Sequence, residues 1–384
     1  MRFPPFVVVL AVVSFSFGGC STVEKLNPFG SSGPKVKPAE LTAIQQSAEL
    51  KTIWQVSVGV AAEYVFSPAV SGDSVYTGAR DGTLARFDGG RQIWRVSAGQ
   101  ILSGGVGSDG KLVAVGTPKG EVLAYDAANG RELWKARVSS EVLAAPAVAD
   151  GLVVVRSGDS RIFGFDAADG KRRWVYQRST PALSLRSSVG VMLAGNTTLA
   201  GFPGGKLVAI ANNNGASVWE VTVALPKGST ELERVADVTS SPAIIGSTLC
   251  AAAYQGRVAC FEASTGNTLW SREMSSSDGV AMDSRFVFVT DDKGAVHALD
   301  RSSGASVWKQ DKLALRSVTR PVALGAYVAV ADYQGVIHLL RREDGAFAAR
   351  LSTDGSAVRA DPVRLGSGLL VQTVGGNAYA LESR

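Results

Sequence analysis

Seven tryptophans occupy one position of a sequence repeat, and this repeat restricts the fold more than any other feature of the chain. The tryptophans are Trp54, Trp94, Trp134, Trp174, Trp219, Trp270 and Trp308. Their spacings are 40, 40, 40, 45, 51 and 38 residues. A period near forty, built from short apolar runs and glycine-containing turns, is typical of a β-propeller blade.

The segment from Gly120 to Trp134 shows how one repeat is built. It contains an alternating apolar run, a turn with Asp126 and Gly130, and a second run that ends in the tryptophan. This order predicts two antiparallel strands joined by a tight turn. A proline or valine fourteen residues before the repeat glycine predicts where two further strands begin. Each repeat is therefore expected to form a blade of four antiparallel strands.

Two further copies of the repeat lack the tryptophan. The copy that begins at Gly335 has Ala349 at that position, and we expect nearby Phe347 to fill part of the space. The copy that begins at Gly376 stops before its last strand, whereas the strand around Trp54 has no preceding half-repeat. We therefore predict an all-β, eight-bladed propeller whose N-terminal strand completes the last blade. This closure removes two open sheet edges.

The first twenty residues have the pattern of an export signal. Arg2 precedes an apolar stretch from Phe6 to Phe17, and two glycines lead to Cys20. The pattern resembles a bacterial lipoprotein signal, which implies lipidation of Cys20 and, because Ser21 follows it, sorting to the outer membrane. A multiply acylated cysteine anchors firmly, since each buried CH₂ contributes about 0.8 kcal/mol. The alternative is a secretory signal with an incidental cysteine.

These observations divide the chain into three parts. We expect a signal peptide at 1–19, a lipidated cysteine with a flexible tether at 20–40, and the propeller at 41–384. The tether is rich in Pro, Gly, Ser and Lys, which is typical of a flexible linker. The net charge of +5 includes no basic run, so no nucleic-acid partner is expected.

The length variation between repeats falls mainly in two consecutive connections between blades. They run from Trp174 to Val191 and from Trp219 to Pro242. Both join the last strand of one blade to the first strand of the next, so we expect them on the same face of adjacent blades. Repeat scaffolds commonly carry such insertions on their binding face.

The residues in these two loops allow two interpretations. Leu183 and Leu185 alternate with Ser184 and precede Arg186, and Asp237 lies on the second loop. Exposed leucines beside an arginine would suit a protein–protein contact. Alternatively, the leucines fold back onto the propeller and Arg186 pairs internally with Asp237.

The repeats resemble those of the eight-bladed pyrroloquinoline-quinone dehydrogenases. A closer resemblance rests on four features together: the lipoprotein signal, the eight blades, the loop Ala-Leu-Ser-Leu-Arg at 182–186, and Gly-Ser-Thr-Glu-Leu-x-Arg-x-x-Asp at 228–237. As a set, they resemble the BamB family of outer-membrane assembly lipoproteins. This resemblance implies a non-enzymatic scaffold, lipid-anchored at the periplasmic face of the outer membrane, in the machine that inserts β-barrel proteins.

The resemblance also implies a partner. In that family the two loops contact a periplasmic domain of the machine's integral barrel subunit, which makes Leu183, Leu185, Arg186 and Asp237 the candidate contacts. Thr239 stands where the family often has a second acidic residue. Unfolded outer-membrane proteins, paired with blade edges by β-augmentation, are a second candidate partner. The propeller is expected to be monomeric within the complex.

A propeller of this kind could also serve as a quinone-dependent dehydrogenase or bind cell-wall polysaccharide. The chain has no adjacent cysteine pair and no assignable acid cluster of the kind the quinone enzymes use, so we expect no cofactor and no catalysis. His297 and His338 occupy equivalent positions in consecutive repeats, but no cysteine or third histidine joins them as a metal ligand. Cys250 and Cys260 flank a predicted hairpin turn and form either a disulfide or two packed thiols.

Overall fold

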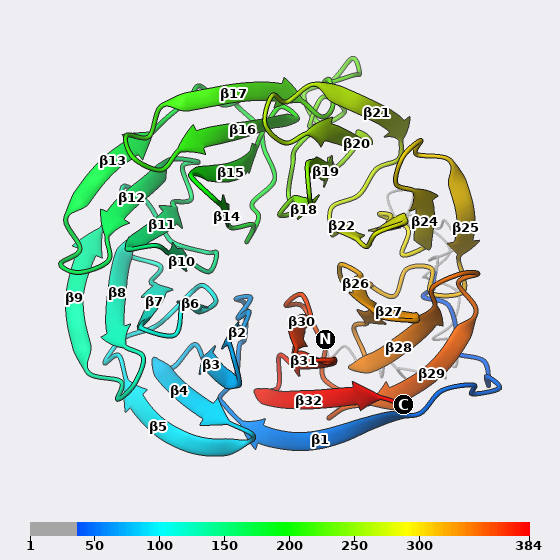
Figure 1. Cartoon of the computed structure of the whole chain (residues 1–384), viewed down its shortest axis with the longest axis horizontal. Helices are drawn as coiled ribbons and strands as arrows, with labels where there is room; N and C mark the ends of the chain where they lie inside the picture. The colour runs from blue at the N-terminus through cyan, green and yellow to red at the C-terminus, as the bar shows by residue number, and fades with distance from the viewer. Residues whose placement is uncertain (1–36) are drawn as a thin grey trace, which may run out of the picture. The chain divides into compact units, whose positions relative to one another are not determined.

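The computed structural model describes residues 37–384, which form eight four-stranded antiparallel sheets arranged as a ring (Figure 1). The prediction of an all-β, eight-bladed propeller is confirmed. Within each blade the first strand lies innermost and the last lies at the rim. The described residues contain no helix long and apolar enough to cross a membrane. The expected signal peptide, Cys20 and nearly all of the tether lie outside the described residues.

Blades 1 to 7 each consist of four consecutive strands. Blade 1 contains β2 (Ala69–Ser71), β3 (Ser74–Gly78), β4 (Thr83–Asp88) and β5 (Arg91–Ser97); blade 2 contains β6 (Gly107–Ser108), β7 (Leu112–Gly116), β8 (Glu121–Asp126) and β9 (Glu132–Arg137). Blade 3 contains β10 (Ala147–Ala149), β11 (Leu152–Arg156), β12 (Ile162–Asp166) and β13 (Arg172–Tyr176); blade 4 contains β14 (Met192–Ala194), β15 (Thr197–Phe202), β16 (Lys206–Ala211) and β17 (Ser217–Thr222). Blade 5 contains β18 (Ala243–Ile245), β19 (Thr248–Ala252), β20 (Arg257–Glu262) and β21 (Thr268–Glu273); blade 6 contains β22 (Gly279–Met282), β23 (Phe286–Thr290), β24 (Val296–Asp300) and β25 (Ser306–Gln310). Blade 7 contains β26 (Val322–Leu324), β27 (Tyr327–Ala331), β28 (Val336–Arg341) and β29 (Phe347–Ser352).

Blade 8 closes the ring with strands from both ends of the propeller. Its strands β30 (Val363–Leu365), β31 (Gly368–Gln372) and β32 (Asn377–Ser383) are completed at the rim by β1 (Leu50–Ser57). β1 pairs antiparallel with β32, as Figure 1 shows for the blue and red strands. The predicted closure is therefore confirmed.

An aspartate and a glycine shape the turn before the tryptophan strand of blade 3. In blade 3 the Asp166 carboxylate accepts the N–H of Ala168 at 2.9 Å, and the N–H of Gly170 donates to the Asp166 carbonyl at 2.9 Å. Gly170 has a φ of 71°, a left-handed conformation that glycine adopts without steric cost. This geometry turns β12 back into β13 and places Gly170 at the surface of the blade.

Each tryptophan packs against the turn glycine of the following blade. A Cβ atom added to any of these glycines would lie 2.5–3.1 Å from the neighbouring indole. The pairs are Trp54–Gly90, Trp94–Gly130, Trp134–Gly170, Trp174–Gly215, Trp219–Gly266, Trp270–Gly304 and Trp308–Gly345. In six pairs the indole Nε1 also donates to a backbone carbonyl of that turn, at 2.7–3.1 Å. The tryptophan thus joins neighbouring blades by both packing and hydrogen bonding.

The blade without a tryptophan is the one whose neighbour lacks this turn. Blade 8 has no turn between its last two strands, because the ends of the propeller meet there. Ala349 instead packs in a cluster with Leu50, and Ala48 lies against the same cluster. The expectation for Phe347 was wrong: it packs toward blade 6, on the opposite side of blade 7 from Ala349.

The hydrophobic core is divided among the eight contacts between neighbouring blades. Each of eight separate clusters draws its members from two adjacent sheets. The cluster between blades 8 and 1 includes Val75, Phe87 and Leu370, so the junction that closes the ring also has an apolar core. The structure joins Cys250 and Cys260 by a disulfide between β19 and β20, inside the cluster of blades 5 and 6.

The residues just before β1 lie along blade 7. The guanidinium of buried Arg316 donates to the Ala39 carbonyl at 2.9 Å and to Asp332 at 2.7 Å, and Arg350 donates to the Thr42 carbonyl. His338 connects the two arginines, because Asp332 and Arg350 contact its two ring nitrogens at 3.1 and 3.2 Å. Burial lowers the pKa of His338, which keeps the ring neutral in this network.

Two glycine substitutions separate the effect of the tryptophan contact from backbone strain. Gly170 and Gly151 have φ values of 71° and 73°, but only a Cβ at Gly170 would meet the Trp134 indole, at 2.5 Å; nothing lies within 4 Å of one at Gly151. Both alanine variants carry the same left-handed strain, about 1 kcal/mol. We expect Gly170→Ala to lose a further 1–3 kcal/mol, roughly, through overpacking. Denaturant unfolding measures both variants, and equal losses would contradict the contact.

Candidate functional site

The two long loops lie on adjacent blades and touch each other. The first, residues 177–191, joins β13 to β14, and the second, residues 223–242, joins β17 to β18. Both connect a rim strand to the innermost strand of the next blade (Figure 1). Leu185 of the first loop and Asp237 of the second are in direct contact.

Asp237 holds this contact together. Its carboxylate is buried, at 2 % exposure, and accepts the N–H of Leu185 at 2.7 Å and the N–H of Gly204 at 3.1 Å. Hydrogen bonds to an ionised acceptor are stronger than those between neutral groups. One carboxylate therefore fixes the first loop, the second loop and the β15–β16 turn relative to one another.

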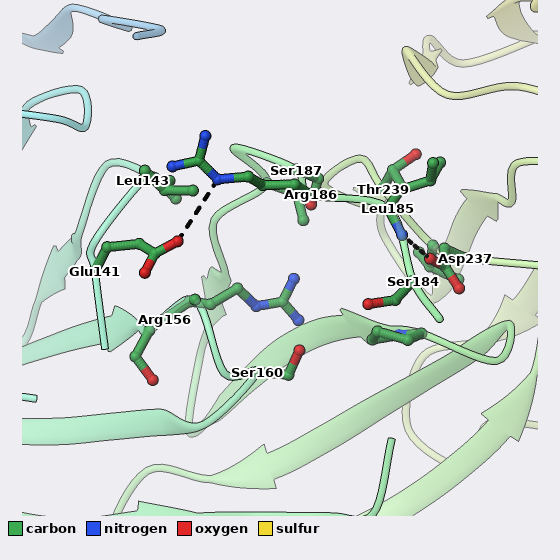
Figure 2. A pocket seen from close by; sticks show the side chains of 16 residues that line it. Glu141, Leu143, Arg156, Ser160, Ser184, Leu185, Arg186, Ser187, Asp237 and Thr239 are labelled. Carbon is green, nitrogen blue, oxygen red and sulfur yellow. Dashed lines mark hydrogen bonds and ion pairs between the residues drawn. The ribbon is translucent and has the colours of Figure 1, made fainter. Parts of the chain in front are cut away.

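Arg186 and the two leucines face solvent. Leu183 and Leu185 are 43 % and 39 % exposed. Arg186 does not pair with Asp237; its exposed side chain lies 3.5 Å from Glu141, on the connection between blades 2 and 3 (Figure 2). The alternative in which the leucines fold back and Arg186 pairs with Asp237 is therefore wrong.

The second loop contains a self-capped turn that presents another leucine. The Glu233 carboxylate accepts the N–H groups of Ser229 and Thr230 at 2.8 and 3.1 Å, and the Thr230 hydroxyl accepts the N–H of Glu233 at 3.2 Å. This reciprocal pattern is a capping box. The two backbone donors lower the pKa of Glu233. Leu232, inside this turn, is 69 % exposed, and Leu225 at the start of the loop is also exposed.

A polar cavity of about 160 Å³ lies beneath the first loop. Figure 2 shows Arg186 and Glu141 at one side of it and Arg156 extending into its interior, and Ser160 and Ser184 also line it. Thr239 also lines this cavity, and its hydroxyl donates to the Ser277 carbonyl at 3.0 Å. The cavity thus contains residues from both loops and from blade 3.

A second cavity, of about 340 Å³, is lined by residues next to the innermost strands of several blades. Its charged residues are Asp278, Arg359 and Asp361. Burial, followed by the nearby charge of Asp361, raises the pKa of Asp278 to about 7. Burial also raises the pKa of Asp361, although Arg320 opposes this shift. The two carboxyls therefore resist simultaneous ionisation.

Neither histidine belongs to a metal site in the described part of the chain. The Nε2 of His297 lies 2.9 Å from Asp291, and the Nε2 of His338 lies 3.1 Å from Asp332, six residues earlier in each blade. Among residues 37–384, no group of three or more His, Cys, Asp or Glu side chains could hold a metal ion. Their equivalent positions in the repeat reflect an equivalent structural bond.

Comparisons with known proteins identify the family. A family model described as "Outer membrane protein assembly factor BamB" matches residues 80–310. The chain is 44 % identical to a protein of that name from Bordetella pertussis over 98 % of this chain and 96 % of the relative, and 42 % identical to one from Burkholderia pseudomallei over 90 % and 92 %. The chain belongs to the BamB family. The crystal structure of BamB from Moraxella catarrhalis matches with a TM-score of 0.81 and 28 % identity, over 87 % of this chain and all of the other.

More distant structures share the BamB fold but carry no further argument. A quinohemoprotein alcohol dehydrogenase from Comamonas testosteroni matches with a TM-score of 0.69 at 13 % identity, over 86 % of this chain and 76 % of that one. At this identity the likeness shows only a common propeller. The matches to BamB proteins confirm the expected resemblance to that family.

The sequence analysis missed several residues of this candidate site. It did not single out Glu141 or Arg156, and it did not predict the exposure of Leu225 and Leu232. A signal for Arg156 was present in the repeat, because the residues four positions before the repeat glycine are otherwise small or uncharged. They are Gly78, Gly116, Gly201, Ala252, Thr290, Ala331 and Gln372.

Removing the Asp237 carboxylate should release the first loop. In Asp237→Ala the N–H groups of Leu185 and Gly204 lose their acceptor, so we expect faster hydrogen exchange at Leu185 and a loss of about 1–3 kcal/mol in unfolding free energy. Thr239→Ala is the matched control, because it removes a side-chain bond from the same loop without touching the first. Unchanged exchange at Leu185 in Asp237→Ala would show that the carboxylate does not hold the loop.

The raised pKa of Asp278 predicts a pH-dependent effect on stability. Between about pH 4 and 7, Asp278 keeps a proton in the folded state that it has released in the unfolded state. Its contribution to the free energy of unfolding therefore falls by about 1.4 kcal/mol per pH unit as pH rises. Asp278→Asn cannot ionise, so its stability relative to the unmodified protein should increase from pH 4 to pH 7. Asp73→Asn, on an exposed turn, is the control. Parallel stability curves from denaturant titrations would contradict the shift.

Proposed function

We propose that this chain is a non-enzymatic scaffold in outer-membrane protein assembly, anchored through Cys20 at the periplasmic face of the outer membrane. Its two long loops would bind the integral barrel subunit of the β-barrel assembly machinery. The relatives named "Outer membrane protein assembly factor BamB" support the role in assembly. The observation that carries the binding site is the group of exposed side chains on two loops fixed by Asp237.

Apolar side chains and a charge next to each other favour a protein partner. Leu183, Leu185, Leu225 and Leu232 are each at least 39 % exposed, and all four lie on the two loops. Binding a partner would bury them, at a gain of roughly 25 cal/mol per Å² of apolar surface. Arg186 adds a donor suited to carboxylate recognition. Because the loops are already fixed, binding a partner would cost little additional conformational entropy.

Asp237 has a different role in this proposal from the other three candidate residues. Its carboxylate is buried and occupied by two backbone N–H groups, so it acts by positioning Leu185 rather than by touching the partner. Leu183, Leu185 and Arg186 are the proposed contacts. This division means that Asp237 variants should weaken binding through loop mobility.

A second partner is favoured by the rims of the blades. In six blades the residue before the tryptophan on the outermost strand is an exposed aliphatic side chain. These residues are Ile53, Ile93, Leu133, Val218, Leu269 and Val307. A rim strand is paired on one side only. We propose that unfolded outer-membrane proteins pair with these edges by β-augmentation.

Arg186→Glu tests the loop assignment. Reversing this charge should abolish co-purification with the barrel subunit and leave the melting temperature unchanged, because Arg186 is exposed and its pair with Glu141 contributes only about 0–1 kcal/mol. Arg285→Glu is the matched control, since Arg285 is an equally exposed arginine paired with Glu343 at 3.3 Å on another blade. Normal binding by Arg186→Glu would refute the assignment.

A further inference from the structure

The cavity beneath the first loop contains a positive charge without a counter-ion. One Arg156 nitrogen donates to the Gly201 carbonyl, the guanidinium lies 5.1 Å from the Phe202 ring centroid, and Nε has no hydrogen-bond partner. Within the described residues, Arg156 forms no ion pair. Burial lowers its pKa to about 10, so the group is still charged at neutral pH. A buried donor without an acceptor is costly, and more so when it is charged.

The other charges around the cavity already have partners. Asp237 accepts two backbone N–H groups. The two oxygens of Glu141 face the Ser140 hydroxyl at 2.9 Å and Arg186 at 3.5 Å. The unmatched charge is therefore positive, and a group that pairs with it would be an anion.

The size of the cavity suits a small anionic group. Its volume of about 160 Å³ equals roughly five water molecules at about 30 Å³ each, which is enough for one acidic side chain. Organic cofactors occupy sites of about 300–1,000 Å³. Figure 2 shows the Arg156 guanidinium directed into the cavity, and Ser160 and Ser184 also line it. Serine hydroxyls are donors to a carboxylate.

We propose that this cavity receives one aspartate or glutamate side chain of the barrel subunit, whose carboxylate pairs with Arg156. This inference rests on the proposed function and names the chemistry of its contact. Entry requires little rearrangement, because the Arg186–Glu141 pair beside the cavity is 3.5 Å long and Arg186 is exposed. Arg186 can then act as a second donor to the same partner surface.

The fold itself does not require a charge at position 156. Gln372 occupies the equivalent position in blade 8, and its Nε2 donates to the carbonyl of Gly78 in the next blade at 3.0 Å. Arg156 makes the same kind of bond to Gly201, which is equivalent to Gly78 in the repeat. A neutral glutamine can therefore supply the bond between blades.

This equivalence provides a matched variant. Arg156→Gln retains a donor for Gly201 and removes the charge, so the melting temperature of the full chain should stay within a few degrees of that of the unmodified protein. Binding to the purified periplasmic region of the barrel subunit, measured by surface plasmon resonance, should weaken at least about tenfold. The change should appear mainly in the dissociation rate, as expected for a desolvated charge pair. Arg156→Met, which retains packing on Phe202, serves if the glutamine variant is unstable.

The outcomes separate the inference from the function on which it rests. Native affinity in Arg156→Gln, together with lost binding in Arg186→Glu, would overturn the carboxylate contact and leave the loop site intact. Native affinity in both variants would overturn the proposed function as well. Each acidic residue of the barrel subunit's periplasmic region should also be replaced by its amide. One replacement should weaken binding to the unmodified protein but cause no further loss of affinity for Arg156→Gln. If no position is coupled in this way, the inference is wrong.

Discussion

The ring depends on the contact between a tryptophan and the turn glycine of the next blade. A blade alone has two apolar faces, and the eight clusters show that every face is buried only by its neighbour. The indole supplies a large apolar surface and a directed N–H donor, so it fixes both the distance and the rotation between two sheets. Glycine is required opposite it, because a Cβ there would meet the ring and the turn needs a left-handed residue.

The exception at blade 7 follows from the same constraint. A tryptophan at position 349 would have no turn to pack against, because blade 8 is completed by β1 rather than by a hairpin. Residues Ala48 and Leu50 cover Ala349 instead, and the two arginines Arg316 and Arg350 hold the preceding backbone on blade 7. The absence of a tryptophan from blade 7 therefore follows from the position at which the ring closes.

The fold could be predicted from the sequence because it is repetitive. Strand order, blade number and ring closure follow from features that recur in phase, and Trp54 revealed the displaced strand by its lack of a half-repeat. The site could be predicted only as far as its loops. The bond from Leu185 to Asp237 joins residues 52 positions apart, and the pair of Arg186 with Glu141 joins different connections. Contacts of this kind depend on the path of the loop backbone, which does not follow the sequence repeat and so could not be predicted from it. Phe347 was misplaced because a bulge between Leu339 and Leu340 on β28 lets Phe347 and Ala349, only two positions apart, pack on opposite sides of blade 7.

A repetitive scaffold makes its functional residues recognisable as exceptions to the repeat. At the position of Arg156 the other seven blades carry a small or uncharged residue. Only blade 3 has a charged side chain at this position, Arg156. It lies beside the two longest connections between blades. The ring does not need this charge, because the neutral Gln372 makes the equivalent bond between blades. These two departures from the repeat coincide in space and the fold does not need them, which is the basis for proposing that this face binds a partner.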